Sequence, residues 1–207
     1  MSEKQRGVLF LGSAFVVCVV LLFPAKVLLF HEGLYREQYV KNGAYATFGR
    51  EEVDSATEKL LAFLKTGDGL ETPFFNEREK RHMEDVRGLY RGGLRVLYGS
   101  LLGFLVVCGV VRKRRSIGAM LVGGSSAAVF LLILLLLLVV SDFSVLFTLF
   151  HQGAFSNDLW QLNPATDNMA VLFPESFFMS FVMTSSLYSG VMAALMGGMG
   201  IVLRRAG

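Results

Sequence analysis

Apolar residues in this chain are gathered in four long blocks that are separated by polar segments. The blocks span residues 8–30, 94–111, 117–140 and 177–203. Each has close to the roughly 20 residues that a helix needs to cross the apolar part of a bilayer. The pattern therefore predicts an all-α membrane protein with four transmembrane helices, and we expect residues 1–207 to form a single integral membrane domain.

The composition agrees with a membrane protein. Of the 207 residues, 53% are hydrophobic and 18% are charged, and the mean hydropathy is +0.52, which is too apolar for an ordinary soluble domain. The net charge of +3 is too small to indicate a nucleic-acid partner. Cys18 and Cys108 both fall inside predicted spans, so the cysteines indicate neither a disulfide framework nor a metal site.

Basic residues cluster at three places beside the predicted spans. They are Lys4 and Arg6 before the first span, Arg112–Arg115 between the second and third, and Arg204 and Arg205 after the fourth. With four spans all three clusters lie on one side, and the positive-inside rule makes that side cytoplasmic. The link 112–116 is then cytoplasmic, and the segments 31–93 and 141–176 are extracytoplasmic.

The first span also has features of a signal peptide, because a basic start precedes its apolar run. However, apolar residues resume after Pro24 and extend to Phe30. We therefore expect the first span to be retained.

The long polar segment between the first two spans is predicted to be helical. Apolar residues recur every three or four positions within Glu51–Lys65, and the run Thr66–Gly69 then ends the pattern. Asn76 begins a second helix as its N-cap, with Glu79 as the capping partner. Gly92 and Gly93 permit a bend, so we expect this helix to lie along the membrane surface and to turn there into the second span.

Small residues at four-residue steps predict close packing between spans. Gly99 and Gly103 have this spacing in the second span, and Gly190, Ala194 and Gly198 have it in the fourth. We expect neighbouring helices to approach at these positions.

Polar residues are unusually dense between the third and fourth spans, and histidine is among them. His151 follows the third span directly, and His82 lies before the second span, in the other extracytoplasmic segment. Two imidazoles with the nearby carboxylates of Asp85 and Asp158 could form a general acid/base pair. The alternative is that each histidine is simply hydrated at the membrane interface.

Three other residues of this segment are candidate supporting or substrate-binding groups. Asn157 and Asn163 either shape turns or, for Asn157, donate to an oxyanion. Trp160 is either an anchor at the membrane interface or a wall of the site. The chain has no G-x-S-x-G, H-E-x-x-H or phosphate-loop motif, so neither a serine hydrolase nor a zinc protease is indicated.

Three motifs resemble those of a bacterial integral-membrane family that includes the lipoprotein intramolecular transacylase (Lit). They are F-x-x-x-E-x-x-H-M-x-D-V over 75–86, F-H-x-x-x-F-x-N-D-x-W-x-L-N-P over 150–164, and F-P-E-x-F-F over 173–178. The resemblance covers nearly the whole chain, and the second motif is the most specific.

The resemblance implies an acyltransferase in the bacterial cytoplasmic membrane with its active site on the extracytoplasmic side. The substrate would be a diacylated lipoprotein, whose sn-2 acyl chain moves to the amine of the N-terminal cysteine and leaves a lyso-form lipoprotein. His82 and His151 carry over as the catalytic pair. No metal or other cofactor is implied, the partners would be lipoproteins and membrane lipid, and we expect a monomer.

The mechanism that we expect makes His151 the general base for the attacking amine. His82 would polarise the ester carbonyl or stabilise the oxyanion, with help from Asn157 or a backbone N–H, and Asp85 or Asp158 would orient an imidazole. The residues also permit the two histidines to exchange roles.

Two other classes of function fit the same residues. One is a metal-dependent membrane hydrolase with His82, His151, Asp85 and Asp158 as ligands. The other is a non-enzymatic tetraspan chaperone or sensor that uses the outer segment as a docking surface.

Overall fold

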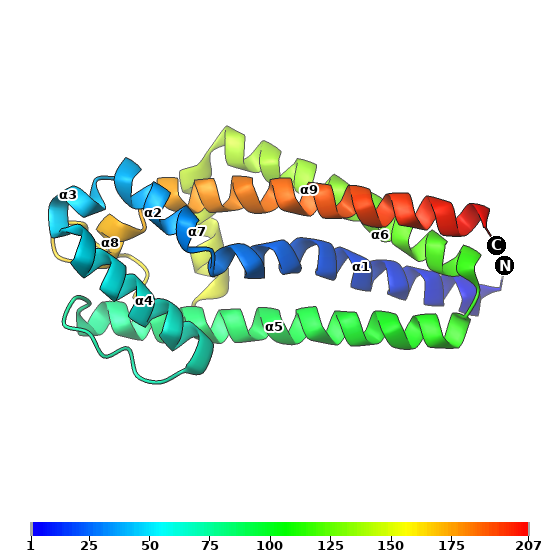
Figure 1. The fold of residues 1–207 in the computed structure, drawn as a ribbon, viewed down its shortest axis with the longest axis horizontal. Coiled ribbons are helices and arrows are strands. Elements are labelled where there is room, and N and C mark those ends of the chain that lie inside the picture. The colour runs from blue at the N-terminus through cyan, green and yellow to red at the C-terminus, as the bar shows by residue number, and fades with distance from the viewer. Residues whose placement is uncertain (1, 207) are drawn as a thin grey trace. The chain divides into compact units, whose positions relative to one another are not determined.

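The computed structural model describes residues 2–206, and that part of the chain forms helices and connecting loops without a strand (Figure 1). Four of these helices are long and apolar enough to cross a membrane. They are α1 (Glu3–Leu29), α5 (Glu77–Val111), α6 (Arg114–Ser141) and α9 (Glu175–Arg205). The shorter helices are α2 (Glu32–Lys41), α3 (Ala44–Phe48), α4 (Arg50–Thr66), α7 (Phe143–Ala154) and α8 (Asn168–Leu172). The prediction of an all-α membrane protein with four spans is confirmed.

The chain divides into two compact units. The first unit contains Met1–Val27, Gly93–Ser141 and Val182–Gly207, and the second contains Leu28–Gly92 and Asp142–Phe181. Helices α1, α5 and α9 contribute residues to both units. The expectation of a single integral membrane domain stays a prediction.

The first unit is a bundle of the apolar parts of α1, α5, α6 and α9 (Figure 1). Its buried core joins Val16 and Val20 of α1, Leu121 and Ala128 of α6 and Ala193 of α9. Large apolar side chains also cover much of its exposed surface, as expected where lipid is the solvent.

Close helix contacts in the first unit lie mostly at glycines other than the predicted ones. A Cβ at Gly200 of α9 would come within 2.8 Å of the Gly118 carbonyl oxygen of α6, and one at Gly124 within 2.6 Å of the Ser13 carbonyl oxygen of α1. Among the predicted glycines only Gly103 packs tightly, against Phe15. The prediction was wrong for Gly99, Gly190 and Gly198, where an added Cβ would meet no atom of another helix within 4 Å. Four-residue spacing does not say which face a helix presents to its neighbours.

The basic clusters lie at one end of the first unit. The start of α1, the link between α5 and α6 and the end of α9 are together there (Figure 1), and the Arg204 side chain reaches Gly118 at the start of α6. This arrangement agrees with the prediction that all three clusters share one side.

The second unit has an aromatic core of its own. Tyr35 and Tyr39 of α2 pack against Phe173 and, for Tyr35, against Phe177 of α9. The hydroxyl of Tyr39 shares a 2.8 Å hydrogen bond with Thr57 of α4, so this buried polar atom is satisfied. Helix α4 ends at Gly67 in the left-handed conformation with φ of 86°, as the run after Lys65 predicts.

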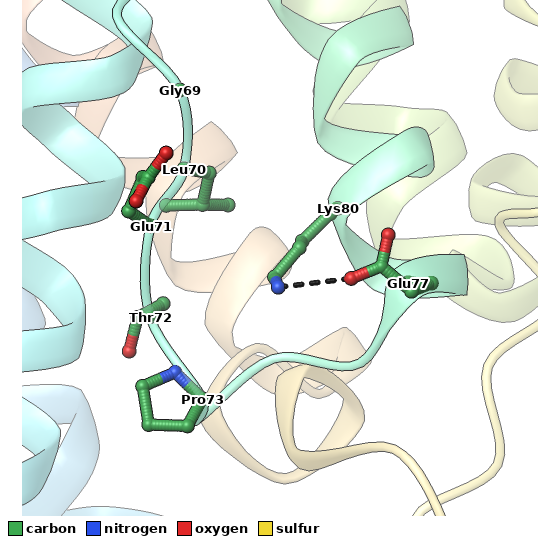
Figure 2. Close-up of a pocket in the computed structure, with 7 residues that line it drawn as sticks. All are labelled: Gly69, Leu70, Glu71, Thr72, Pro73, Glu77 and Lys80. Carbon is green, nitrogen blue, oxygen red and sulfur yellow. Dashed lines mark hydrogen bonds and ion pairs between the residues drawn. The ribbon is translucent and has the colours of Figure 1, made fainter.

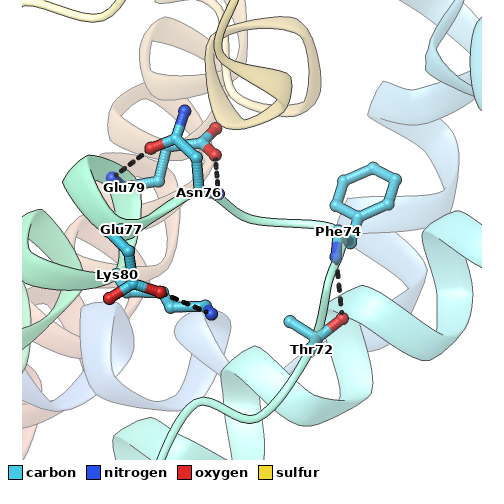
Figure 3. A network of polar contacts seen from close by, with 6 residues as sticks. All are labelled: Thr72, Phe74, Asn76, Glu77, Glu79 and Lys80. Carbon is cyan, nitrogen blue, oxygen red and sulfur yellow. Dashed lines mark hydrogen bonds and ion pairs between the residues drawn. The ribbon is translucent and has the colours of Figure 1, made fainter.

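The predicted capping box at the start of α5 is confirmed. The Glu79 carboxylate accepts a 2.6 Å hydrogen bond from the backbone N–H of Asn76, and the Asn76 side chain accepts one of 3.0 Å from the N–H of Glu79 (Figure 3). The same carboxylate accepts a bond of 2.6 Å from the N–H of Met169 in α8, and Asn76 donates to Asp167. The cap therefore also fixes α5 against the segment that follows the third span.

The helix that begins after Asn76 is not a separate surface helix. It continues through Gly92 and Gly93 as one helix to Val111, so the predicted turn at this glycine pair was wrong. A helical glycine keeps its backbone hydrogen bonds, so two adjacent glycines permit a bend without requiring one.

Candidate active site

The site is formed by two helices and one loop of the second unit. Helix α5 presents Arg78, His82 and Asp85, which lie on one face because they are four and three residues apart. Helix α7 presents His151 one turn after Phe147. The side chain of Asp142 accepts a hydrogen bond of 3.1 Å from the N–H of Val145, which caps the first turn of α7.

The structure brings the two predicted histidines together. The ring centroids of His82 and His151 are 6.3 Å apart and the ring planes are inclined by 33°. Only 7% of His82 and 6% of His151 is exposed, so both rings are largely removed from bulk water. Their expected proximity is confirmed, and their catalytic role stays a prediction.

The hydrogen bond of His151 determines which ring nitrogen carries the proton. Its Nδ1 lies 2.7 Å from the backbone carbonyl oxygen of Phe147. A carbonyl oxygen can only accept, so Nδ1 must be the donor. In the neutral ring Nε2 then has a free lone pair and is able to accept a proton. Burial lowers the pKa of His151, and the bond to Phe147 partly opposes that shift, so the ring is neutral at pH 7.

His82 has a different environment. Its Nδ1 is buried and has no hydrogen-bond partner among the described residues. Burial, followed by the nearby His151, lowers the pKa of His82 to about 4, and the Asp85 charge opposes this shift. A buried ring nitrogen without a partner is unusual in a folded protein, and it is available to a bound ligand.

Aromatic side chains surround the two imidazoles. Phe155 packs edge-on against His82 at 5.2 Å and lies 5.7 Å from His151. Trp160 lies 5.0 Å from His151 with an angle of 31° between the planes. Trp160 therefore forms a wall of the site, one of the two roles that its sequence position allows. This aromatic surrounding explains why the rings are desolvated.

The predicted carboxylates do not orient the imidazoles. Asp85 accepts a hydrogen bond of 2.9 Å from the side chain of Asn157, and the side chain of Asp158 accepts one of 3.4 Å from Gln161. Among the described residues neither carboxylate is bonded to a histidine, which corrects the expected mechanism. A backbone carbonyl takes that role for His151, and sequence spacing does not reveal it.

Asn163 lies outside the histidine pair and shapes its own loop. Its side chain accepts a 3.0 Å bond from the N–H of Ala165, and its N–H donates to the buried Asp167 at 2.7 Å. Asn163 therefore shapes a turn, and its recorded hydrogen bonds within residues 2–206 do not involve either imidazole.

Two residues near the histidines were not predicted from the sequence. Phe155 belongs to the second family-like motif, but nothing in its position says that it touches both rings. Arg78 donates to two loop carbonyl groups. It lies one helical turn before His82, and this spacing could have predicted that it shares a face with that histidine.

A hollow of about 590 Å³ lies elsewhere in the second unit (Figure 2). It is lined by residues 69–73 together with Glu77 and Lys80, which form an ion pair of 3.0 Å. None of the candidate site residues lines it. Nor does the described part of the chain gather three or more His, Cys, Asp or Glu side chains in a geometry that could hold a metal ion, which leaves the metal-hydrolase alternative without a ligand set.

Comparison with known protein families agrees with this geometry. A family model described as lipoprotein intramolecular transacylase Lit matches residues 10–178. The chain belongs to this family. Family membership makes it an acyltransferase, and the four apolar helices make it a multi-pass membrane protein. None of the curated protein sequences compared with the chain matches it.

Solved structures share the fold. The membrane-integral lipoprotein intramolecular transacylase Lit from Bacillus cereus superposes with a TM-score of 0.90 at 20% identity, over 100% of this chain and 98% of that chain. Two further structures of that protein, with one histidine replaced by arginine or by alanine, give TM-scores of 0.84 and 0.85. These also have 20% identity, and they cover 99% of this chain and 93% and 95% of theirs.

Proposed function

We propose that this protein moves the sn-2 acyl chain of a diacylglyceryl lipoprotein to the α-amine of its N-terminal cysteine, which leaves a lyso-form lipoprotein. The single observation that carries the proposal is the proximity of two buried, neutral imidazoles, His82 and His151, at 6.3 Å. Family membership supports the type of reaction.

His151 is the general base in this mechanism. Its free Nε2 takes a proton from the amine as the amine nitrogen attacks the ester carbonyl carbon, and a C–N bond forms. The tetrahedral intermediate then breaks its bond to the glyceryl oxygen. The protonated Nε2 returns its proton to that oxygen, so the products are an amide and a free hydroxyl, and the imidazole is neutral again.

His82 stabilises the charge that develops on the carbonyl oxygen. The neutral ring carries one N–H, which can donate to the oxyanion in a desolvated site. With a pKa of about 4, the ring does not become a permanent cation at pH 7. His82 therefore carries no positive charge that would oppose protonation of His151. Asn157 is bonded to Asp85 and supports the loop rather than the oxyanion.

Donor and acceptor belong to one substrate molecule, so the enzyme orients groups that are already linked. Such intramolecular reactions gain much of their rate from geometry. A free α-amine has a pKa of about 7.7–8.0, so an appreciable neutral fraction is available to attack at pH 7. Neither metal nor soluble cofactor takes part in these steps.

The site faces the extracytoplasmic side in this proposal. If each long helix crosses the membrane once, residues 31–93 and 141–176 lie opposite the three basic clusters, and those clusters mark the cytoplasmic side. The partners are then diacylated lipoproteins of the bacterial cytoplasmic membrane and the surrounding lipid, and the enzyme acts as a monomer.

The decisive experiment uses the purified protein in lipid nanodiscs with a synthetic diacylglyceryl lipopeptide whose sn-2 chain is isotopically labelled. Mass spectrometry should show the label in an N-terminal amide. His82→Ala and His151→Ala should each abolish this product. The matched control is His31→Ala, because His31 is an exposed histidine before α2, and this variant should retain activity.

Two results would contradict the proposed function. Label that stays on the glycerol in the wild-type product would exclude sn-2 transfer. Full activity in both His82→Ala and His151→Ala, with normal membrane insertion, would exclude the histidine mechanism. Activity that is lost on chelation and restored by a divalent metal would favour the metal-hydrolase alternative.

A further inference from the structure

One face of α5 holds the loop of residues 157–161 at two points. Nη2 of Arg78 donates to the carbonyl oxygens of Asp158 at 2.8 Å and Gln161 at 3.0 Å. One and a half to two turns further along the helix, Asp85 accepts from the side chain of Asn157 at 2.9 Å. His82 lies between these two attachment points on the same face.

The loop between the attachment points is a compact turn that carries Trp160. The Asn157 side chain accepts a 3.0 Å bond from the N–H of Leu159, and the N–H of Gln161 donates to the Asp158 carbonyl at 3.2 Å. Trp160 is the only tryptophan of the chain. Its indole stacks on His151 at 5.0 Å, so the position of the loop determines how the indole covers that imidazole.

The contacts of Arg78 are poorly suited to a purely structural role. Its bonds to the loop are exposed to solvent, and exposed polar contacts contribute little to the free energy of unfolding. The core of the second unit is instead formed by the aromatic cluster and the capping box. The contacts of Arg78 therefore act locally, on the loop that carries them, and add little to the stability of the unit as a whole.

We propose that Arg78 is a positioning residue, which holds residues 158–161 so that Trp160 covers the His151 ring and keeps its Nε2 in line with the substrate amine. The inference rests on the proposed function, since Arg78 touches neither imidazole. Asp85 and Asn157 form the second attachment of the same loop. Arginine suits this role because its planar group can donate to two carbonyl oxygens at once.

The indole of Trp160 provides a readout that is independent of catalysis. A protonated imidazole quenches a stacked indole more strongly than a neutral one, so Trp160 emission reports the titration of His151. The polar groups recorded near His151 among residues 2–206 are the Phe147 carbonyl on its own helix and His82 on α5. Asp85 is the nearby charged group that acts on His82.

The test compares Arg78→Ala, Arg78→Lys and the control Arg81→Ala, which removes an exposed arginine from the same helix. In Arg78→Ala we expect acrylamide to quench Trp160 about twice as strongly, and the midpoint of the emission titration to move up towards 6.5. The kcat for acyl transfer should fall about tenfold with little change in KM, because misplacement of a catalytic group acts on the chemical step.

The two remaining variants should show smaller effects than Arg78→Ala. Arg78→Lys keeps the charge but cannot donate in the same planar geometry, so its quenching and kcat should lie between those of the wild type and Arg78→Ala. Arg81→Ala should match the wild type in quenching, titration midpoint and kcat. A similar, smaller change in Asp85→Ala would support the two-point attachment.

Unchanged quenching and an unchanged midpoint in Arg78→Ala would overturn the inference, whatever happens to the melting temperature. So would a changed indole signal with wild-type kcat, because the loop position would then not matter for the reaction. If the wild-type protein transfers no acyl group, the proposed function fails and the positioning role fails with it. The quenching comparison would then still show whether Arg78 holds the loop.

Discussion

The surroundings of His82 on α5 and of His151 on α7 differ in one decisive respect. The Nδ1 of His151 is bound to the Phe147 carbonyl, which fixes the tautomer, whereas the Nδ1 of His82 is buried and has no hydrogen-bond partner within residues 2–206. Both rings are desolvated, and burial lowers the pKa of each. The difference therefore lies in orientation rather than in charge.

Within the proposed mechanism, this difference favours one assignment of the two roles. A base needs a fixed ring and a free lone pair, which fits His151. A donor to an oxyanion needs a nitrogen that the protein has not already engaged, which fits His82. In that mechanism the two imidazoles are not interchangeable.

The largest expected effect comes from glutamine substitutions at these two positions. His151→Gln removes the proposed general base and should reduce kcat about 10²–10⁴-fold. His82→Gln keeps an amide N–H donor and should lose only about tenfold. Initial rates of N-acyl product formation, measured by mass spectrometry in nanodiscs, would distinguish the two variants.

The reverse order would show that the histidines have exchanged roles. Equal, wild-type rates in both glutamine variants would show that neither imidazole takes part in proton transfer. His31→Gln is the matched control for the substitution itself.

Substitutions of two phenylalanines should have smaller effects, which depend on whether the side chain contacts one imidazole or both. Phe155 contacts both rings, while Phe150 packs edge-on against His151 at 5.3 Å and has no ring contact with His82 among the described residues. Phe155→Ala should lower kcat about tenfold or more, because water then reaches both imidazoles and both rings are held less firmly. Phe150→Ala should lower it only about threefold. Size-exclusion chromatography and circular dichroism would confirm that each variant is folded, and equal rates in the two would remove the distinction.

The change of Trp160 emission with pH should be small and should occur only below pH 6.5. Burial lowers the pKa of His151 below its usual value of 6.5, so the neutral ring persists as pH falls through 6.5 and protonation comes only below it. We therefore expect constant emission from pH 8 to 6.5 and quenching at lower pH. His151→Gln should remove this step, and a step at or above pH 6.5 in the wild type would contradict the burial of the ring. The activity profile is less informative here, because the substrate amine titrates near neutrality.

The smallest expected effect belongs to the hollow beside α5. Lys80→Ala breaks an ion pair with the largely exposed Glu77, and such pairs contribute about 0–1 kcal/mol to the free energy of unfolding. The rate of acyl transfer should change less than about twofold. A larger loss would mean that the hollow, rather than the histidine pair alone, contacts the substrate.

Features that depend on local sequence could be predicted. The four spans follow from the length of their apolar runs, the end of α4 follows from Gly67, and the capping box follows from the spacing of Asn76 and Glu79. Each needs only neighbours within a few residues, so one sequence contains enough information.

Features that depend on long-range packing could not. The positions of His82 and His151 beside the spans suggested a pair, and the family-like motifs strengthened that prediction. Which groups orient them depends on how α5, α7 and the loop at Trp160 meet. A backbone carbonyl, rather than a predicted carboxylate, is the hydrogen-bond partner of His151. The glycine spacing likewise predicted helix contacts on the wrong faces. Neither signal in the sequence specifies the direction in which a side chain points.

The cap of α5 has a consequence for the order in which the protein is made. Glu79 and Asn76 are bonded to Met169 and Asp167, which lie 90 and 91 residues further along the chain. Chains emerge from the ribosome N-terminus first, so the turn that carries His82 leaves the exit tunnel well before the groups that hold it. The cap of α5 is therefore completed only after residues 167–169 have been made, so the helical turn before His82 gains these contacts late in synthesis.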